Sequence, residues 1–178
     1  MSAVLHQPRL TVPIGERDHV LSRGAELTLL EYGDYECPFC GAAAASVEQL
    51  MRIMGNEVQF AYRHFPLAQI HPHAQLAAEA AEAAGQQGRF WDMHQLLFAH
   101  QDRLDPPDLI GHASTLRLDL RRFALDLETH AHAPRVREDF LSGVRSGVNG
   151  TPTFFTNGVR HNGGYDVESL VEALRMTA

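Results

Sequence analysis

The sequence predicts an α/β fold in which an all-helical segment is inserted between a βαβ half and a ββα half. A strand-like run at 26–32, a helix-like run from Cys37 to Met54 and an alternating run at 58–62 follow one another. From about residue 72 to 148, apolar residues recur only at helical spacing. Strand patterns then return before a last helix. We place the three segments at residues 10–70, 71–148 and 149–178.

Local signals define the elements of the first segment. Residues 10–14 are expected to form a short strand that Pro13 interrupts, and the polar residues 15–25 a connection. The strand at 26–32 is expected to be central in the sheet. With the helix and the strand at 58–62 it predicts a right-handed βαβ crossover.

Apolar stripes and caps predict five helices in the middle segment. They are expected at 73–84, at 90–100, from 108 to about 117, after a cap at Asp119, and from Pro134. In the first of these helices, Glu79 and Glu82 are assigned to the polar side. In the last, Val136, Phe140 and Val144 are expected to face inward.

Turn-forming and capping residues predict the elements in the last part of the sequence. Two strand-like runs, 153–156 and 159–161, flank Asn157-Gly158, which favours a hairpin with a type I′ turn. Asp166 can cap the final helix.

Composition excludes several classes of protein. The chain has 178 residues, 44% hydrophobic and 21% charged, with a net charge of −7. It has no basic stretch of the kind that binds nucleic acid and no apolar run of the roughly 20 residues that span a membrane. The stretch from Met1 to Leu10 lacks the apolar core of a secretory signal. Taken as the native start, this predicts a cytoplasmic protein with no membrane partner, whereas a trimmed signal would place it elsewhere.

The only two cysteines form the motif Cys37-Pro38-Phe39-Cys40. Proline is favoured in the first turn of a helix, so the helix is expected to begin at about Cys37 with both sulfurs in its first turn. Residues three apart lie on one helical face, close enough for a disulfide. The N-terminal N–H groups and the helix dipole favour a thiolate at Cys37. Because the helix runs inward from a surface turn, Cys37 is expected to be the solvent-reachable thiol.

Three other interpretations of the cysteine pair are open. A staple across two residues would close a very short loop and stabilise little. A structural zinc site needs four ligands, which nearby histidines would have to complete. Two inert thiols are the third possibility. Redox chemistry is favoured, because a CxxC motif between a strand and a helix is typical of redox-active pairs.

Glu31 is an acid within an apolar strand, six residues before Cys37. One interpretation is a surface carboxylate on an edge strand. The other is a buried acid beneath the cysteine pair, whose raised pKa would suit a proton relay during thiol exchange.

The segment Gly150-Thr151-Pro152-Thr153 precedes the predicted hairpin. A cis peptide bond is essentially a proline feature, and Thr151–Pro152 is a candidate by its position. A proline that opens a strand donates no hydrogen bond to the sheet.

Together these motifs resemble the DsbA-type thiol–disulfide oxidoreductases of the thioredoxin-like superfamily. The resemblance covers about residues 10–177, and its most specific parts are the cysteine motif and the Thr-Pro motif. The other matching motifs are Leu30 to Glu36, His64-Phe65-Pro66-Leu67, Gly88-Arg89-Phe90-Trp91, Val148-Asn149-Gly150 and Asn157-Gly158. It implies a thioredoxin-like fold whose βαβ half carries CxxC and whose ββα half carries a cis-proline.

The resemblance also implies site residues. Cys37 matches the attacking thiol of the family, Cys40 its resolving thiol and Glu31 its buried acid. Pro152 matches the cis-proline that faces the disulfide, and Thr151 the preceding residue that tunes redox behaviour. Phe39 stands where the best-known periplasmic oxidants have a histidine, so the resemblance does not extend to the cation that lowers the thiol pKa there.

Several aromatic residues and histidines have both a structural and a functional interpretation. Tyr35 and Phe39 flank the thiols, and we assign both to the lining of an apolar substrate groove, with internal packing as the alternative. Trp91 is expected in the core or in the lining of a groove. The histidines at 64, 71 and 73 are expected at the surface or as caps, with metal binding as the alternative.

The sequence therefore predicts dithiol–disulfide exchange with protein or peptide thiols. Glutathione or a thioredoxin-type reductant is a further candidate partner, and no cofactor is expected beyond the Cys37–Cys40 pair. The alternatives are a glutathione-dependent transferase or isomerase of the same superfamily, and a metal-binding module built from the two thiols and nearby histidines.

Overall fold

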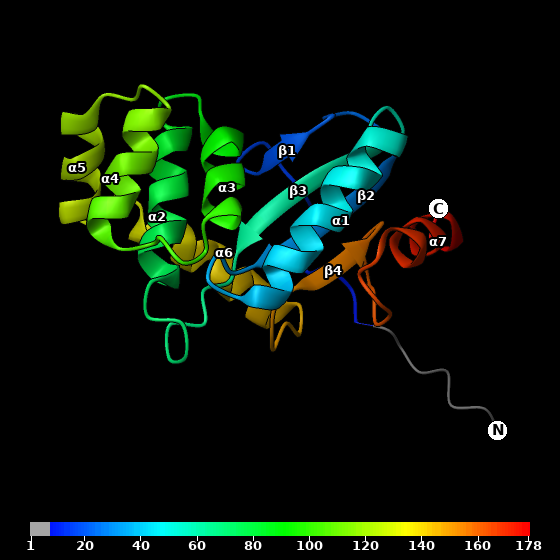
Figure 1. Cartoon of the computed structure of the whole chain (residues 1–178). Coiled ribbons are helices and arrows are strands. Elements are labelled where there is room, and N and C mark those ends of the chain that lie inside the picture. Colours follow the sequence, from blue (N-terminus) through cyan, green and yellow to red (C-terminus); the bar gives the residue numbers. More distant parts are fainter. Residues whose placement is uncertain (1–7) are drawn as a thin grey trace.

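A computed structural model describes residues 8–178, so most of the Met1–Leu10 stretch lies outside the described residues. Its centre is a five-stranded sheet in the order β1-β3-β2-β4-β5 (Figure 1). The strands are β1 (His19–Leu21), β2 (Leu27–Gly33), β3 (Val58–His64), β4 (Thr153–Thr156) and β5 (Val159–Arg160). The helix α1 (Pro38–Met54) connects β2 to β3, which pair in parallel.

β2 is the central strand, as its apolar sequence predicts. It pairs with β3 on one side and antiparallel with β4 on the other. Alternate residues point to opposite faces of a strand. Leu29 therefore packs in the larger core with α1 and α7 (Val167–Met176), whereas Leu30 and Tyr32 pack in a smaller core on the other face.

The prediction for residues 10–25 is wrong in two places. Residues 10–14 form no strand; Leu10 N–H donates to Gly158 O at 2.9 Å beside a single bridge from Arg9 to Val159. β1 lies instead inside the expected connection, antiparallel to β3. A three-residue edge strand gains its order from its partner strand, which local sequence does not reveal.

The inserted segment contains helices only, as predicted. They are α2 (Ala74–Gly85), α3 (Phe90–Ala99), α4 (Pro106–Thr115), α5 (Leu120–Glu128) and α6 (Ala133–Arg145). Figure 1 shows α2 to α5 gathered beyond the β1–β3 side of the sheet. The Asp119 side chain accepts a hydrogen bond from Arg122 N–H at 3.0 Å and so caps α5, as expected.

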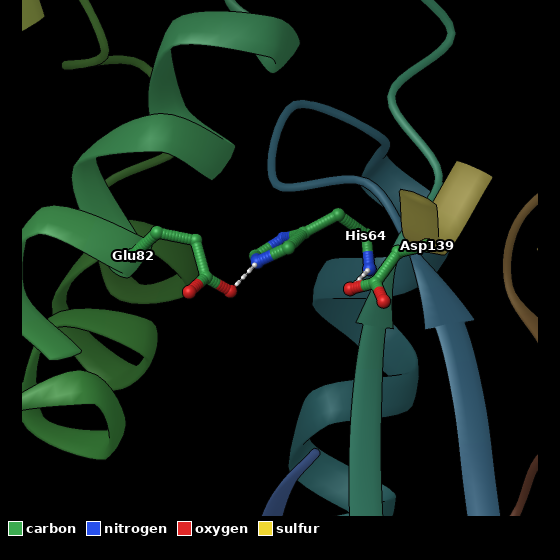
Figure 2. A group of neighbouring side chains, drawn as sticks. All are labelled: His64, Glu82 and Asp139. Atoms are coloured by element: carbon green, nitrogen blue, oxygen red, sulfur yellow. Dashed lines mark hydrogen bonds and ion pairs between the residues drawn. The ribbon is translucent and has the colours of Figure 1, made fainter. Parts of the chain in front are cut away.

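The assignment of Glu79 and Glu82 to a polar helix side is wrong, as is the surface role for His64. Their exposed fractions are 1%, 3% and 1%. Glu82 Oε1 accepts hydrogen bonds from His64 Nε2 at 2.8 Å and from His19 Nε2 at 3.0 Å. Asp139 accepts from the His64 backbone N–H at 3.1 Å (Figure 2). Buried carboxylates persist where partners of this kind satisfy them, and these bonds tie α2 and α6 to the end of β3.

The inward face of α6 also differs from the expectation. Val136 is buried and Phe140 packs against Phe65 in the smaller core, as expected, but Val144 is 50% exposed, and the other buried positions are Asp139, Ser142 and Gly143. Eight residues advance a helix by about 80° beyond two full turns, which rotates Val144 off the Val136 face. A Cβ on Gly143 would lie 2.8 Å from the Phe65 ring, so the helix approaches the sheet too closely for larger residues.

The hairpin and the last helix match their predictions. Asn157 and Gly158 have φ values of +48° and +78°, as a type I′ turn requires. Asp166 accepts a hydrogen bond from Ser169 N–H at 2.9 Å at the start of α7.

Candidate active site

The cysteine motif begins α1, as its proline predicts. Cys37 is the N-cap residue, with φ −73° and ψ 120°, and Cys40 lies in the first helical turn. Neither cysteine is in a disulfide. The exposed fractions are 3% for Cys37 and 0% for Cys40, so Cys37 is the more accessible thiol but is far less open than a surface turn suggests.

The environment of Cys37 favours its thiolate. Its pKa is lowered to about 5, first by a hydrogen bond from the Cys40 thiol, against the opposing effect of partial burial. The Thr151 side chain and the backbone N–H groups of Cys40 and Phe39 lower it further. Burial and the bond to Cys37 raise the pKa of Cys40. These shifts favour a thiolate at Cys37 and a thiol at Cys40 at neutral pH, without the histidine of the best-known oxidants.

Thr151, the residue before Pro152, lies beside Cys37. The peptide bond between Thr151 and Pro152 is cis. The Cys37 thiol donates to the Thr151 carbonyl oxygen, with 3.5 Å between Sγ and O. The Thr151 hydroxyl is buried and has no hydrogen-bond partner among residues 8–178 while Cys37 is a thiol. A thiolate at Cys37 would give that hydroxyl an acceptor.

Glu31 is the buried acid, not an edge-strand carboxylate. It lies on the central strand and is 1% exposed, and its Oε1 has no hydrogen-bond partner in the described chain. Burial, and then the charge of Cys37, raise its pKa to about 8. Glu31 also lines a hollow of about 620 Å³ together with Trp91, His94 and Phe98 of α3. Glu31 can therefore exchange a proton near neutral pH.

The structure separates the two aromatic residues that flank the thiols. Tyr35 is 1% exposed, and its hydroxyl bonds to His94 Nδ1 at 3.0 Å, so the substrate-groove assignment of Tyr35 is wrong. The turn after β2 directs its ring into the core, where burial also lowers the pKa of His94 to about 3. Phe39 is 62% exposed beside the thiols.

Two residues that the sequence analysis did not select hold the turn before Cys37. Asp34 accepts hydrogen bonds at 2.8 Å from Glu36 N–H, from Leu67 N–H and from His71 Nδ1. Its position three residues before a predicted helix is a signal that could have found it. Gln101 donates from Nε2 to Tyr35 O at 2.8 Å and to Cys37 O at 2.9 Å. No local pattern predicts this contact, because more than 60 residues separate the partners.

A metal site at the thiols finds no support in the described residues. There, the one group of three His, Cys, Asp or Glu ligand atoms within 4.8 Å of one another is His64, Glu82 and Asp139, which includes neither cysteine. Glu82 instead bonds to the rings of His64 and His19, and Asp139 bonds to the His64 backbone N–H and to Arg135. His71 and His73 are partly exposed, and neither ring caps a helix: His71 Nδ1 bonds to Asp34 and His73 Nδ1 to Glu36, each at 2.8 Å.

Comparison with known families and structures identifies the fold that carries this site. A family model described as thioredoxin matches residues 18–175. A thioredoxin-like oxidoreductase from Silicibacter pomeroyi superposes with a TM-score of 0.81 and 26% identity over 91% of this chain and 92% of that one. BdbD from Bacillus subtilis superposes with a TM-score of 0.81 and 23% identity, over 90% of this chain and 92% of BdbD. Wolbachia pipientis α-DsbA1 superposes with a TM-score of 0.79 and 19% identity, over 94% of each chain. The fold is thus thioredoxin-like, of the DsbA-like type.

The curated relatives are much longer proteins. A Na⁺/H⁺ antiporter NhaA 1 from Salinispora arenicola is 51% identical over 167 residues, which is 93% of this chain and 26% of the antiporter. An antiporter NhaA 3 from Salinispora tropica is 49% identical over the same shares. The chain spans about a quarter of the length of these relatives. Among residues 8–178, no helix combines the length and the hydrophobicity of a membrane span.

Loss of the Cys40 hydrogen bond should raise the Cys37 pKa. Hydrogen bonds to charged groups contribute about 1.5–3 kcal/mol, so we expect Cys40→Ala to raise that pKa by about 1–2 units. Cys40→Ser keeps a donor and should retain most of the lowering. The ultraviolet absorbance of the thiolate, followed against pH, measures the value. Equal pKa values in the Ala and Ser variants would contradict the assigned cause.

Glu31 should make the fold less stable as the pH rises. The unfolded chain loses the Glu31 proton near pH 4.5, whereas the folded chain keeps it to about pH 8. Between these values the folded state binds more protons, so the free energy of unfolding falls as pH increases. The Glu31→Gln variant lacks this pH-dependent fall in the free energy of unfolding. We expect it to be more stable than wild type by about 3–5 kcal/mol above pH 8, with little difference near pH 4.

Urea unfolding of the reduced proteins at both pH values tests this prediction. The difference between wild type and variant isolates Glu31 from the other titrating groups. Glu48→Gln is the matched control, because Glu48 pairs with Arg52 at the surface and should change stability by less than about 1 kcal/mol at either pH. A Glu31→Gln protein less stable than wild type above pH 8 would contradict the raised pKa of Glu31.

Proposed function

Because the chain belongs to the thioredoxin family, we propose that it exchanges a Cys37–Cys40 dithiol or disulfide with protein or peptide thiols. The observation that supports this proposal most strongly is the difference between the pKa values of the two thiols at the start of α1. Cys37 has a pKa of about 5, whereas the pKa of Cys40 is raised. A thiolate is the nucleophile of thiol–disulfide exchange, so Cys37 attacks and Cys40 resolves.

In the proposed reaction, the Cys37 thiolate attacks one sulfur of a substrate disulfide. A mixed disulfide forms, and the other substrate sulfur leaves as a thiolate that takes up a proton. The Cys40 thiol then loses its proton to the ionised form of Glu31, a fraction of which is present near neutral pH because its pKa is about 8. The Cys40 thiolate attacks Cys37, forms the Cys37–Cys40 disulfide and releases the second substrate sulfur. Two electrons pass to the substrate, and the reverse sequence oxidises a substrate dithiol.

The surface around Cys37 supports a peptide substrate. The exposed Phe39 ring offers apolar contact beside the sulfur. Thr151, which Pro152 follows, lies beside Cys37 at the helix N-terminus, where an extended segment can run past the Cys37 sulfur. We assign Phe39, Thr151 and Pro152 to substrate binding and withdraw Tyr35. Glutathione or a thioredoxin-type protein is the proposed partner that resets the pair.

The proposal concerns the part of the curated relatives that this chain matches. Retention of both cysteines favours dithiol exchange over a glutathione-dependent transferase or isomerase, which resembles this layout with a serine or a single cysteine. Ion transport appears in the names of relatives about four times as long, of which the chain matches 26%. We infer that thiol exchange is the activity of that matched portion.

Trapping of the mixed disulfide tests the proposal. Cys40→Ser leaves the attacking thiolate without a resolving thiol, so incubation with a peptide disulfide should accumulate a one-to-one adduct at Cys37. Cys37→Ser is the matched control and should accumulate none. Mass spectrometry of the intact protein and of its peptides measures both. An adduct at Cys40 in the control, or none in either variant, would contradict the roles of the two cysteines.

A further inference from the structure

The side chain of Gln101 contacts the active-site turn from the inserted helical segment. It lies just after α3 in the chain, where the sequence turns toward α4. One amide nitrogen, Nε2, donates to the carbonyl oxygens of Tyr35 and Cys37 at 2.8 and 2.9 Å. Both N–H groups of this amide are therefore used, and the orientation of the amide is fixed.

Gly41 provides the space for this amide. A Cβ built on Gly41 would lie 2.2 Å from Gln101 Oε1 and 2.9 Å from its Cδ. Any side chain at position 41 would therefore displace the Gln101 amide from the start of α1. The glycine that follows the cysteine motif and the glutamine 60 residues later are thus one structural unit.

The two contacted carbonyls determine how the helix begins. Cys37 O also accepts the Gly41 N–H at 3.1 Å, an early backbone bond of α1. The direction of this carbonyl defines ψ at Cys37, which is 120°. That angle orients the Cys37 side chain relative to the N–H groups of Phe39 and Cys40. Asp34 holds the other side of the same turn through Glu36 N–H.

We propose that Gln101 is a positioning residue for disulfide exchange, which keeps the Cys37 sulfur over the N-terminus of α1 by clamping the carbonyls of Tyr35 and Cys37. This inference rests on the proposed function. Without the clamp, the turn can rotate and the sulfur loses part of its contact with the helix N–H groups. The inserted helical segment thereby takes part in the chemistry without touching substrate.

Gln101→Met tests the clamp, because methionine has a similar length and no donor. We expect the thiolate transition of Cys37, followed by ultraviolet absorbance, to move up by about one pH unit. The rate of reaction with a small aromatic disulfide at pH 5 should then fall about fivefold, following the thiolate fraction. The matched control is Gln86→Met, since Gln86 is exposed and should leave both values unchanged.

Gly41→Ala provides an independent test that keeps Gln101 itself. Alanine is favourable in a helix, and the group it meets is the end of a flexible side chain, so the fold should persist. We expect the thiolate transition of Cys37 to move up in pH by the same amount as in Gln101→Met. In a Gln101→Ala background, Gly41→Ala should add no further shift, because the amide it displaces is gone.

The outcomes separate this inference from the proposed function. Shifts in both single variants, with no added effect in the double variant, support the clamp. A thiolate transition unchanged in Gln101→Met or in Gly41→Ala overturns it. The absorbance titration needs no substrate. A wild-type protein that reacts with no disulfide would therefore overturn the exchange proposal while the titration still decides the role of Gln101.

Discussion

The site depends on the position of Cys37 at the N-terminus of α1, where several neighbouring groups favour the thiolate form of one sulfur. The Cys40 thiol, the Thr151 side chain and two backbone N–H groups all favour its thiolate. A helix N-terminus provides unpaired N–H groups and a favourable dipole, so no cationic side chain is required. The Pro38-Phe39 spacer is therefore compatible with a strongly lowered thiol pKa.

Other parts of the fold hold this arrangement in place. The turn from Asp34 to Cys37 is fixed by the Asp34 carboxylate and by the Gln101 amide. The polar bonds of Glu82 and Asp139 to His64 anchor helices of the inserted segment to the end of the neighbouring strand. Beneath the pair, Glu31 is held in an environment that raises its pKa to about 8. The inserted segment and the sheet thus both contribute contacts that hold the surroundings of one sulfur.

Local patterns predict most elements of this fold but not the contacts between distant residues. The cysteine helix, the Asn157-Gly158 hairpin and the Asp119 and Asp166 caps depend on residues within a few positions, and they match. The prediction of an exposed Glu82 is wrong because the histidines that bind its carboxylate lie on strands far away in the sequence. The prediction that Tyr35 lines a substrate groove is wrong because the turn that directs its ring inward is held by Gln101, which follows α3. Likewise, the short strand β1 depends on its pairing with β3.

A redox titration tests the central claim most directly. The protein is equilibrated in mixtures of reduced and oxidised glutathione, and the fraction of Cys37–Cys40 disulfide is read by mass spectrometry after acid quenching. A stabilised Cys37 thiolate favours the reduced form, so we predict one two-electron transition at a potential above about −300 mV, outside the range of structural disulfides. A pair that stays oxidised well below that potential, or that forms no disulfide in any mixture, would contradict the account.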